Sequence, residues 1–127
     1  MNIEDAHTIG EYEVVVFADA SVENIRDFSL SRVAPKSKAD FSMHSIPVGL
    51  VVHLCHQLYQ KKPKAYLLHI KAYQFDFLEP LTNQASDNLR KAVDFLKMAL
   101  ADIDHLPNFL DGFIAINQKQ QAEHTLS

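Results

Sequence analysis

Residues 12–19 read Tyr-Glu-Val-Val-Val-Phe-Ala-Asp. Val14 to Ala18 form a short apolar run, mostly β-branched and aromatic, without polar alternation, and this predicts a strand covered on both faces. The run ends on Asp19. Because ligands gather just past the carboxyl ends of parallel strands, Asp19 would lie where chemistry is expected. The alternative is that Asp19 caps a turn.

The sequence on either side of this strand predicts further elements. Residues 3–11 favour a helix end with Gly10 as its stop signal. Residues 20–43 predict a long loop, in which Phe28, Leu30 and Val33 can form a short edge strand. Residues 45–60 predict a helix with Ser45 as N-cap and Pro47 in its first turn. Its expected apolar face contains Leu50, Val51, Leu54, Cys55 and Leu58.

The second half of the chain repeats the order of strand, loop and helix. A strand is expected over 64–71, an aromatic loop over 72–80 and a helix over about 84–103, capped by Ser86 or Thr82. The apolar face expected for this helix contains Leu89, Val93, Leu96 and Leu100. A short strand is expected over 112–117, followed from Gln118 by a polar, mobile tail.

This order of elements predicts the fold class. Strands joined through helices indicate an α/β domain with parallel strands and right-handed crossovers. A parallel sheet needs cover on both faces, so we expect a three-layer arrangement with a mostly parallel sheet and helices on both faces. Only two strands are strong, and no strand precedes residue 3. We therefore expect the chain to be the larger part of an α/β domain whose opening elements are absent.

Length and composition narrow the class of protein. The chain has 127 residues, which predicts one domain over 1–127, and its net charge of −4 argues against a nucleic-acid partner. The single cysteine, Cys55, excludes an internal disulfide and a multi-cysteine metal site. A signal peptide and an apolar run of membrane-spanning length are both absent from the sequence, so we expect a cytoplasmic protein.

A few residues could carry chemistry. His44 ends the long loop just before a helix, and together with Asp19 it could bind a divalent metal or act as an acid–base pair. The alternative is a structural role for His44. His53 and His56 share a helix face, which favours a solvated surface over a metal pair. His69 lies within an apolar strand, as a hydrogen-bonded core histidine would, and Cys55 is expected to pack in the core.

Four segments in order resemble the hydrogenase maturation proteases. They are Val-Val-Val-Phe-Ala-Asp-Ala (14–20), Met-His-Ser (43–45), Ala-Tyr-Leu-Leu-His-Ile-Lys-Ala-Tyr-Gln-Phe-Asp-Phe (65–77) and Leu-Thr-Asn-Gln-Ala-Ser-Asp-Asn-Leu-Arg-Lys-Ala-Val-Asp-Phe-Leu (81–96). The match runs from about Ile3 to Leu100. These endopeptidases trim a C-terminal extension from the large subunit of nickel–iron hydrogenases.

The resemblance implies an α/β fold with a parallel-sheet core and helices on both faces. It also implies a metal-contacting site, in which Asp19 matches the family's Asp and His44 its His. The ion contacted would be nickel carried by the substrate, the immature hydrogenase large subunit, and the protein would hold no cofactor of its own. The family's third side chain, a Glu in a Gly-rich segment, has no counterpart here, because Glu4 and Glu11 do not match it.

These departures leave three hypotheses open. The first is a hydrogenase maturation endopeptidase, the second a non-catalytic binding or assembly module of the same fold, and the third an unrelated α/β protein. The loop after Asp19 also differs from the family, since Ser21 to Leu30 lack the Pro-Gly that many relatives have. An absent opening strand and helix would expose a sheet edge and an apolar surface, so we expect a homo-oligomer.

Overall fold

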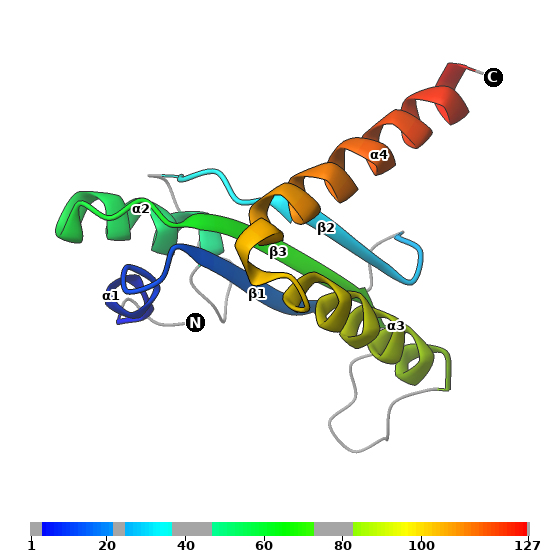
Figure 1. Ribbon diagram of the computed structural model, residues 1–127, viewed down its shortest axis with the longest axis horizontal. Helices are drawn as coiled ribbons and strands as arrows, with labels where there is room; N and C mark the ends of the chain where they lie inside the picture. The colour runs from blue at the N-terminus through cyan, green and yellow to red at the C-terminus, as the bar shows by residue number, and fades with distance from the viewer. Residues whose placement is uncertain (1–3, 22–24, 37–46, 73–82, 127) are drawn as a thin grey trace. The chain divides into compact units, whose positions relative to one another are not determined.

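The computed structural model describes residues 4–21, 25–36, 47–72 and 83–126 (Figure 1). One three-stranded sheet has the order β1-β3-β2, with β1 parallel to β3. The helices are α1, α2, α3 and α4, and a 3-10 turn, η1, precedes α4. The bounds are α1 Asp5–Ile9, β1 Val14–Ser21, β2 Phe28–Arg32, α2 Val48–Tyr59, β3 Lys64–Lys71, α3 Asn83–Leu100, η1 Ile103–His105 and α4 Leu106–Leu126.

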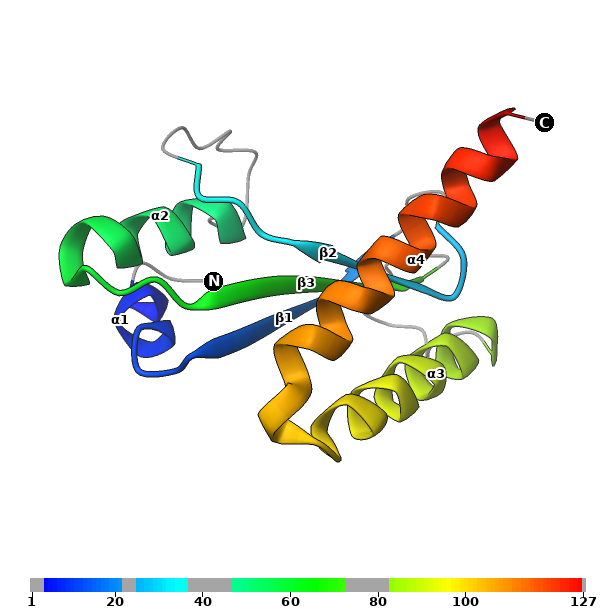
Figure 2. The same cartoon turned by 45° about the horizontal axis from the view of Figure 1, so that its top comes forward.

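The sheet confirms the expected α/β class but is mixed. The Val33 N–H donates to the Ala65 carbonyl and the Lys71 N–H donates to the Asp27 carbonyl, so β2 runs antiparallel to β3. Figures 1 and 2 show β3 between β1 and β2. The short edge strand expected near Phe28 is confirmed as β2, and the strand expected over 64–71 is confirmed with its bounds.

The chain divides into two compact units, and the strands contribute to both. The first unit contains Met1–Phe17 and Arg32–Leu67, and the second contains Ala18–Ser31 and Leu68–Ser127. In the first unit, α1 ends at Ile9 before Gly10, as expected. A side chain at position 10 would meet the Cys55 Sγ at 3.3 Å, so glycine allows α1 and α2 to approach closely.

The core of the first unit is formed by α1, α2 and the first halves of β1 and β3. Among the described residues, the buried side chains that form it are Ala6, Ile9, Phe17, Val51, Val52, Cys55 and Ala65. The helix expected over 45–60 is present, but it begins at Val48 with Pro47 as N-cap, so the prediction of Ser45 as N-cap is wrong. The expected apolar face is also partly wrong, because Leu58 is 59 % exposed and Val52 is buried in its stead.

The core of the second unit is built by α3, α4 and β2. Phe95 on α3 contacts three aromatic rings, with centroid distances of 5.2 Å to Phe28, 5.6 Å to Phe109 and 4.5 Å to Phe113. The Phe28 and Phe113 rings stack at 5.9 Å. Helices α3 and α4 meet at η1 and diverge from there (Figure 2). This aromatic cluster therefore ties both helices to β2.

The buried face of α3 differs from the expected one. Its buried residues are Ala85, Asn88, Ala92, Phe95 and Ala99. Leu89, Val93 and Leu100 are exposed, and Leu96 is half-buried, so the predicted Leu89-Val93-Leu96-Leu100 face is wrong. The helical period was predicted correctly, but three alanines turn the adjacent side of the helix inward because small residues allow close approach to its neighbours.

The C-terminal region is helical. Helix α4 runs over Leu106–Leu126, so the strand expected over 112–117 is wrong, and the polar segment from Gln118, which we expected to be a mobile tail, is helical up to Leu126. Leu106, Leu110 and Phe113 recur at helical spacing and are buried or half-buried, which gives α4 its inner face. Apart from Ala72, the aromatic loop expected over 72–80 lies outside the described residues. Of the two expected N-caps of α3, Thr82 also lies outside the described residues, and Ser86 lies inside the helix.

None of the described helices has the length and apolarity needed to cross a membrane.

Candidate functional site

Asp19 lies on β1, two residues before the strand ends at Ser21, and its side chain is exposed. The prediction that the run from Val14 to Ala18 is covered on both faces holds for Phe17, which is buried, but not for Ala18, which is exposed; the three valines at 14–16 are half-buried. Because β1 is parallel to β3, both strands deliver their carboxyl ends to the same edge of the sheet. Asp19 is therefore an accessible carboxylate close to that edge.

The register of the sheet places His69 beside Asp19. The Lys64 N–H donates to the Glu13 carbonyl over 2.9 Å, and in a parallel ladder this bond aligns Lys64 with Val14. Each of the two strands has eight residues. Val14 is aligned with Lys64 at their starts, and Ser21 is aligned with Lys71 at their ends. Position 69 is thus aligned with position 19. Aligned residues of neighbouring strands project from the same face, so Asp19 and His69 are cross-strand neighbours.

Ser29 on β2 lies on the other side of His69. Backbone hydrogen bonds at the two ends of β2 pair Val33 with Ala65 and Asp27 with Lys71, and this register places Ser29 opposite His69. Ser29 and His69 are both half-buried. Asp19, His69 and Ser29 therefore follow one another across β1, β3 and β2 on one face of the sheet, and we call these three residues the Asp19 row.

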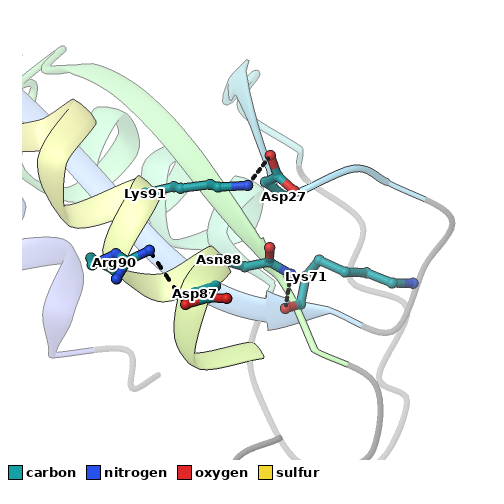
Figure 3. A network of polar contacts seen from close by, with 6 residues as sticks. All are labelled: Asp27, Lys71, Asp87, Asn88, Arg90 and Lys91. Carbon is teal, nitrogen blue, oxygen red and sulfur yellow. Dashed lines mark hydrogen bonds and ion pairs between the residues drawn. The ribbon is translucent and has the colours of Figure 1, made fainter. Parts of the chain in front are cut away.

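A set of polar contacts fixes α3 against the same end of the strands (Figure 3). The buried Asn88 amide donates to the Lys71 carbonyl over 3.2 Å. The Lys91 Nζ pairs with the Asp27 Oδ2 at 3.0 Å, just before β2 begins. Asp27 and Lys71 are themselves opposite one another in the sheet. Helix α3 therefore holds the last residue of β3 and the residue preceding β2.

His44, the second residue of the predicted metal pair, lies outside the described residues, within 37–46. Its pairing with Asp19 therefore stays a prediction. Within the part of the chain that the structure describes, no three His, Cys, Asp or Glu side chains gather as metal ligands do. The Asp19 row offers one carboxylate and one imidazole, which is a two-donor site for a divalent ion that takes its remaining ligands from elsewhere.

The histidine pair His53 and His56 and the single cysteine, Cys55, lie on α2. Cys55 is fully buried, its thiol donates to the Lys61 carbonyl over 3.5 Å, and burial raises its pKa, so its predicted packing role is confirmed. Burial, helped by Lys62 and His53, lowers the pKa of His56. His53 and His56 are half-buried rather than fully solvated.

The sequence did not predict the alignment of Asp19 with His69. The signal that could have revealed it is the polar residue in each apolar strand, Asp19 in β1 and His69 in β3, at matching distances from the strand starts.

Comparison of the chain with models of protein families, with curated proteins and with solved structures finds no match.

Proposed function

We propose that this protein is an endopeptidase similar to the hydrogenase maturation proteases, acting on the C-terminal extension of a nickel-loaded hydrogenase large subunit. The observation that carries the proposal is the ordered set of four segments within 14–96 that resemble this family. The finer arrangement of three layers with helices on both faces of the sheet is part of the same proposal, whereas the mostly parallel sheet that we expected is replaced by the mixed one.

The position of Asp19 supports this proposal chemically. A nickel ion held by another protein can be contacted only by an accessible donor, and the Asp19 carboxylate is exposed near the carboxyl edge of two parallel strands. Carboxylate oxygen and imidazole nitrogen both suit a borderline divalent ion. In the proposed complex, Asp19 and His44 contact the nickel of the precursor, which positions the extension for hydrolysis of one peptide bond.

A cleavage assay with matched variants tests the proposal. Nickel-loaded precursor is incubated with wild-type protein, Asp19→Asn and His44→Gln, and the length of the large subunit is followed over time. Asp104→Asn and His53→Gln are the controls, since Asp104 is an exposed aspartate and both residues lie outside the four segments. We expect cleavage by wild type and both controls, and at least about a hundredfold slower cleavage by the other two variants, within the range for removal of one electrostatic contact.

Two results would overturn the endopeptidase proposal. The first is unchanged activity in Asp19→Asn. The second is a stable complex in which the wild-type protein holds the precursor without shortening it, which would establish the alternative of a non-catalytic binding or assembly module.

A further inference from the structure

We propose that Asp19 and His69 together form a binding site for one borderline divalent cation, Ni²⁺ or Zn²⁺, on the face of the sheet near the carboxyl ends of β1 and β3. This site deepens the proposed function, and the identification of the ion as precursor-bound nickel rests on that function. The residue added to the site is His69, which supplies a nitrogen donor from the neighbouring strand.

The geometry of the sheet brings the two donors within reach of one ion. Neighbouring strands lie about 4.8 Å apart, and side chains of aligned residues project in parallel from one face. The alignment of Asp19 with His69 follows from the Lys64–Glu13 bond and the equal lengths of β1 and β3. Metal–ligand bonds of about 2.0–2.2 Å to imidazole nitrogen and carboxylate oxygen can bridge such a separation.

The surroundings of the pair suit a cation that arrives from outside. Asp19 is exposed and His69 is half-buried, so the ion keeps access to solvent on one side while one donor is partly shielded from water. Ser29, opposite His69 on β2, is placed to accept the imidazole N–H that does not face the metal. Such a partner fixes the orientation of a ligating imidazole and increases its basicity.

The donor set selects the class of ion. One nitrogen and one carboxylate oxygen favour Zn²⁺ and Ni²⁺ over hard ions such as Mg²⁺ and Mn²⁺, which prefer sites made of oxygen alone. Two protein ligands leave at least two positions of a four-coordinate ion open. Ligands from another protein can fill those positions, which is the arrangement required for contact with an ion already bound to a precursor.

Nuclear magnetic resonance with paramagnetic Ni²⁺ tests the site without any activity assay. NiCl₂ is titrated into ¹⁵N-labelled full-length protein, and broadening of backbone amide signals is followed. We expect selective broadening at residues 18–20 and 68–70, and a loss of Ni²⁺ affinity of at least about tenfold in both Asp19→Asn and His69→Gln. MnCl₂, also paramagnetic but hard, should broaden these signals only at much higher concentration.

The variants His53→Gln/His56→Gln and His105→Gln are the matched controls, because the histidine pair on α2 and the exposed His105–Asp102 pair, 2.8 Å apart, are competing imidazole sites in the described residues. Both controls should leave the broadening at 18–20 and 68–70 unchanged. Amide spectra without metal establish that each variant is folded. The inference is overturned if His69→Gln binds Ni²⁺ as tightly as wild type, or if broadening occurs only around His53 and His56 or around Asp102 and His105.

The outcomes of the two tests are separable. If His69→Gln retains wild-type Ni²⁺ binding while Asp19→Asn loses precursor cleavage, the proposed function stands and the role of His69 falls. If nickel broadening at β1 and β3 depends on both residues while the precursor is never cut, the metal site stands and the endopeptidase proposal falls.

Discussion

The side-chain amide of Asn88 donates a hydrogen bond to the backbone carbonyl of Lys71 over 3.2 Å, joining α3 to the last residue of β3. Asn88 is 4 % exposed and is the buried polar side chain on an inner face otherwise made of alanine and phenylalanine. A buried amide is stable only when its hydrogen bonds are made. This contact therefore fixes α3 relative to the strand end that lies beside the Asp19 row.

Replacing Asn88 with alanine tests the importance of this contact. We expect Asn88→Ala to lower the free energy of unfolding by about 1–3 kcal/mol, because a buried hydrogen bond is lost and a small cavity is left. Urea denaturation followed by circular dichroism measures the change. Lys91→Ala is the comparison on the same helix: its ion pair with Asp27 is half-exposed and should contribute less than about 1 kcal/mol. Equal losses in the two variants would contradict the assignment of Asn88 as the stronger anchor.

The aromatic cluster predicts a larger effect at Phe95. Its ring is 8 % exposed and contacts the rings of Phe28, Phe109 and Phe113. Phe95→Ala should cost about 3–5 kcal/mol, because transfer energy is lost and a cavity opens between α3, α4 and β2. Phe109→Ala should cost clearly less, since Phe109 is 38 % exposed. Denaturation midpoints compare the two, and a greater loss in Phe109→Ala would be inconsistent with Phe95 as the centre of the cluster.

The thiol of Cys55 should be unreactive in the folded protein. It is fully buried, and desolvation raises its pKa despite the opposing influence of Lys61, so the reactive thiolate is scarce. We expect Ellman's reagent at pH 8 to label folded protein only as fast as the chain opens, and to label unfolded protein in urea at once. Rapid stoichiometric labelling without urea would show that Cys55 is accessible.

His56 predicts a pH dependence of stability. Burial lowers its pKa in the folded protein, so the unfolded chain binds more protons on acidification. Stability should therefore fall as pH drops below the ordinary histidine pKa of about 6.5 and continue to fall until pH passes the lowered folded value. His56→Gln should flatten this decline between about pH 7.5 and 5, whereas Gln57→Ala, at an exposed position of α2, should keep the wild-type slope. An identical slope in His56→Gln would refute the linkage.

The sequence predicted elements whose signals are local. The strand Lys64–Lys71 was predicted with its bounds because Pro63 precedes a compact apolar run, and α1 was predicted from Gly10. The segment 112–117 was misassigned because periodicity alone does not distinguish a short apolar run in a strand from one in a helix. Leu106 and Leu110, which lie ahead of this run at helical spacing, provide the evidence for α4.

Long-range relationships were not accessible from periodicity. The choice between the leucine face and the alanine face of α3 depends on how closely the helix approaches its neighbours, and this distance is not encoded in the helical period. The alignment of Asp19 with His69 depends on the strand order of the sheet. Strand β3 is the neighbour of β1 in the sheet, although β2 and α2 separate the two strands in the sequence. Asp19 was therefore predicted as a site residue, whereas its neighbour His69 was assigned to the core.

The most direct test of the proposed function is the intact mass of a hydrogenase large-subunit precursor, measured before and after incubation with this protein. The precursor is supplied in nickel-loaded and nickel-free forms, so that contaminating proteases, which do not require nickel, are distinguished. We expect the loaded form alone to lose the mass of its C-terminal extension in a single cut. A loaded precursor of unchanged mass, or equal cleavage of both forms, would contradict the proposal.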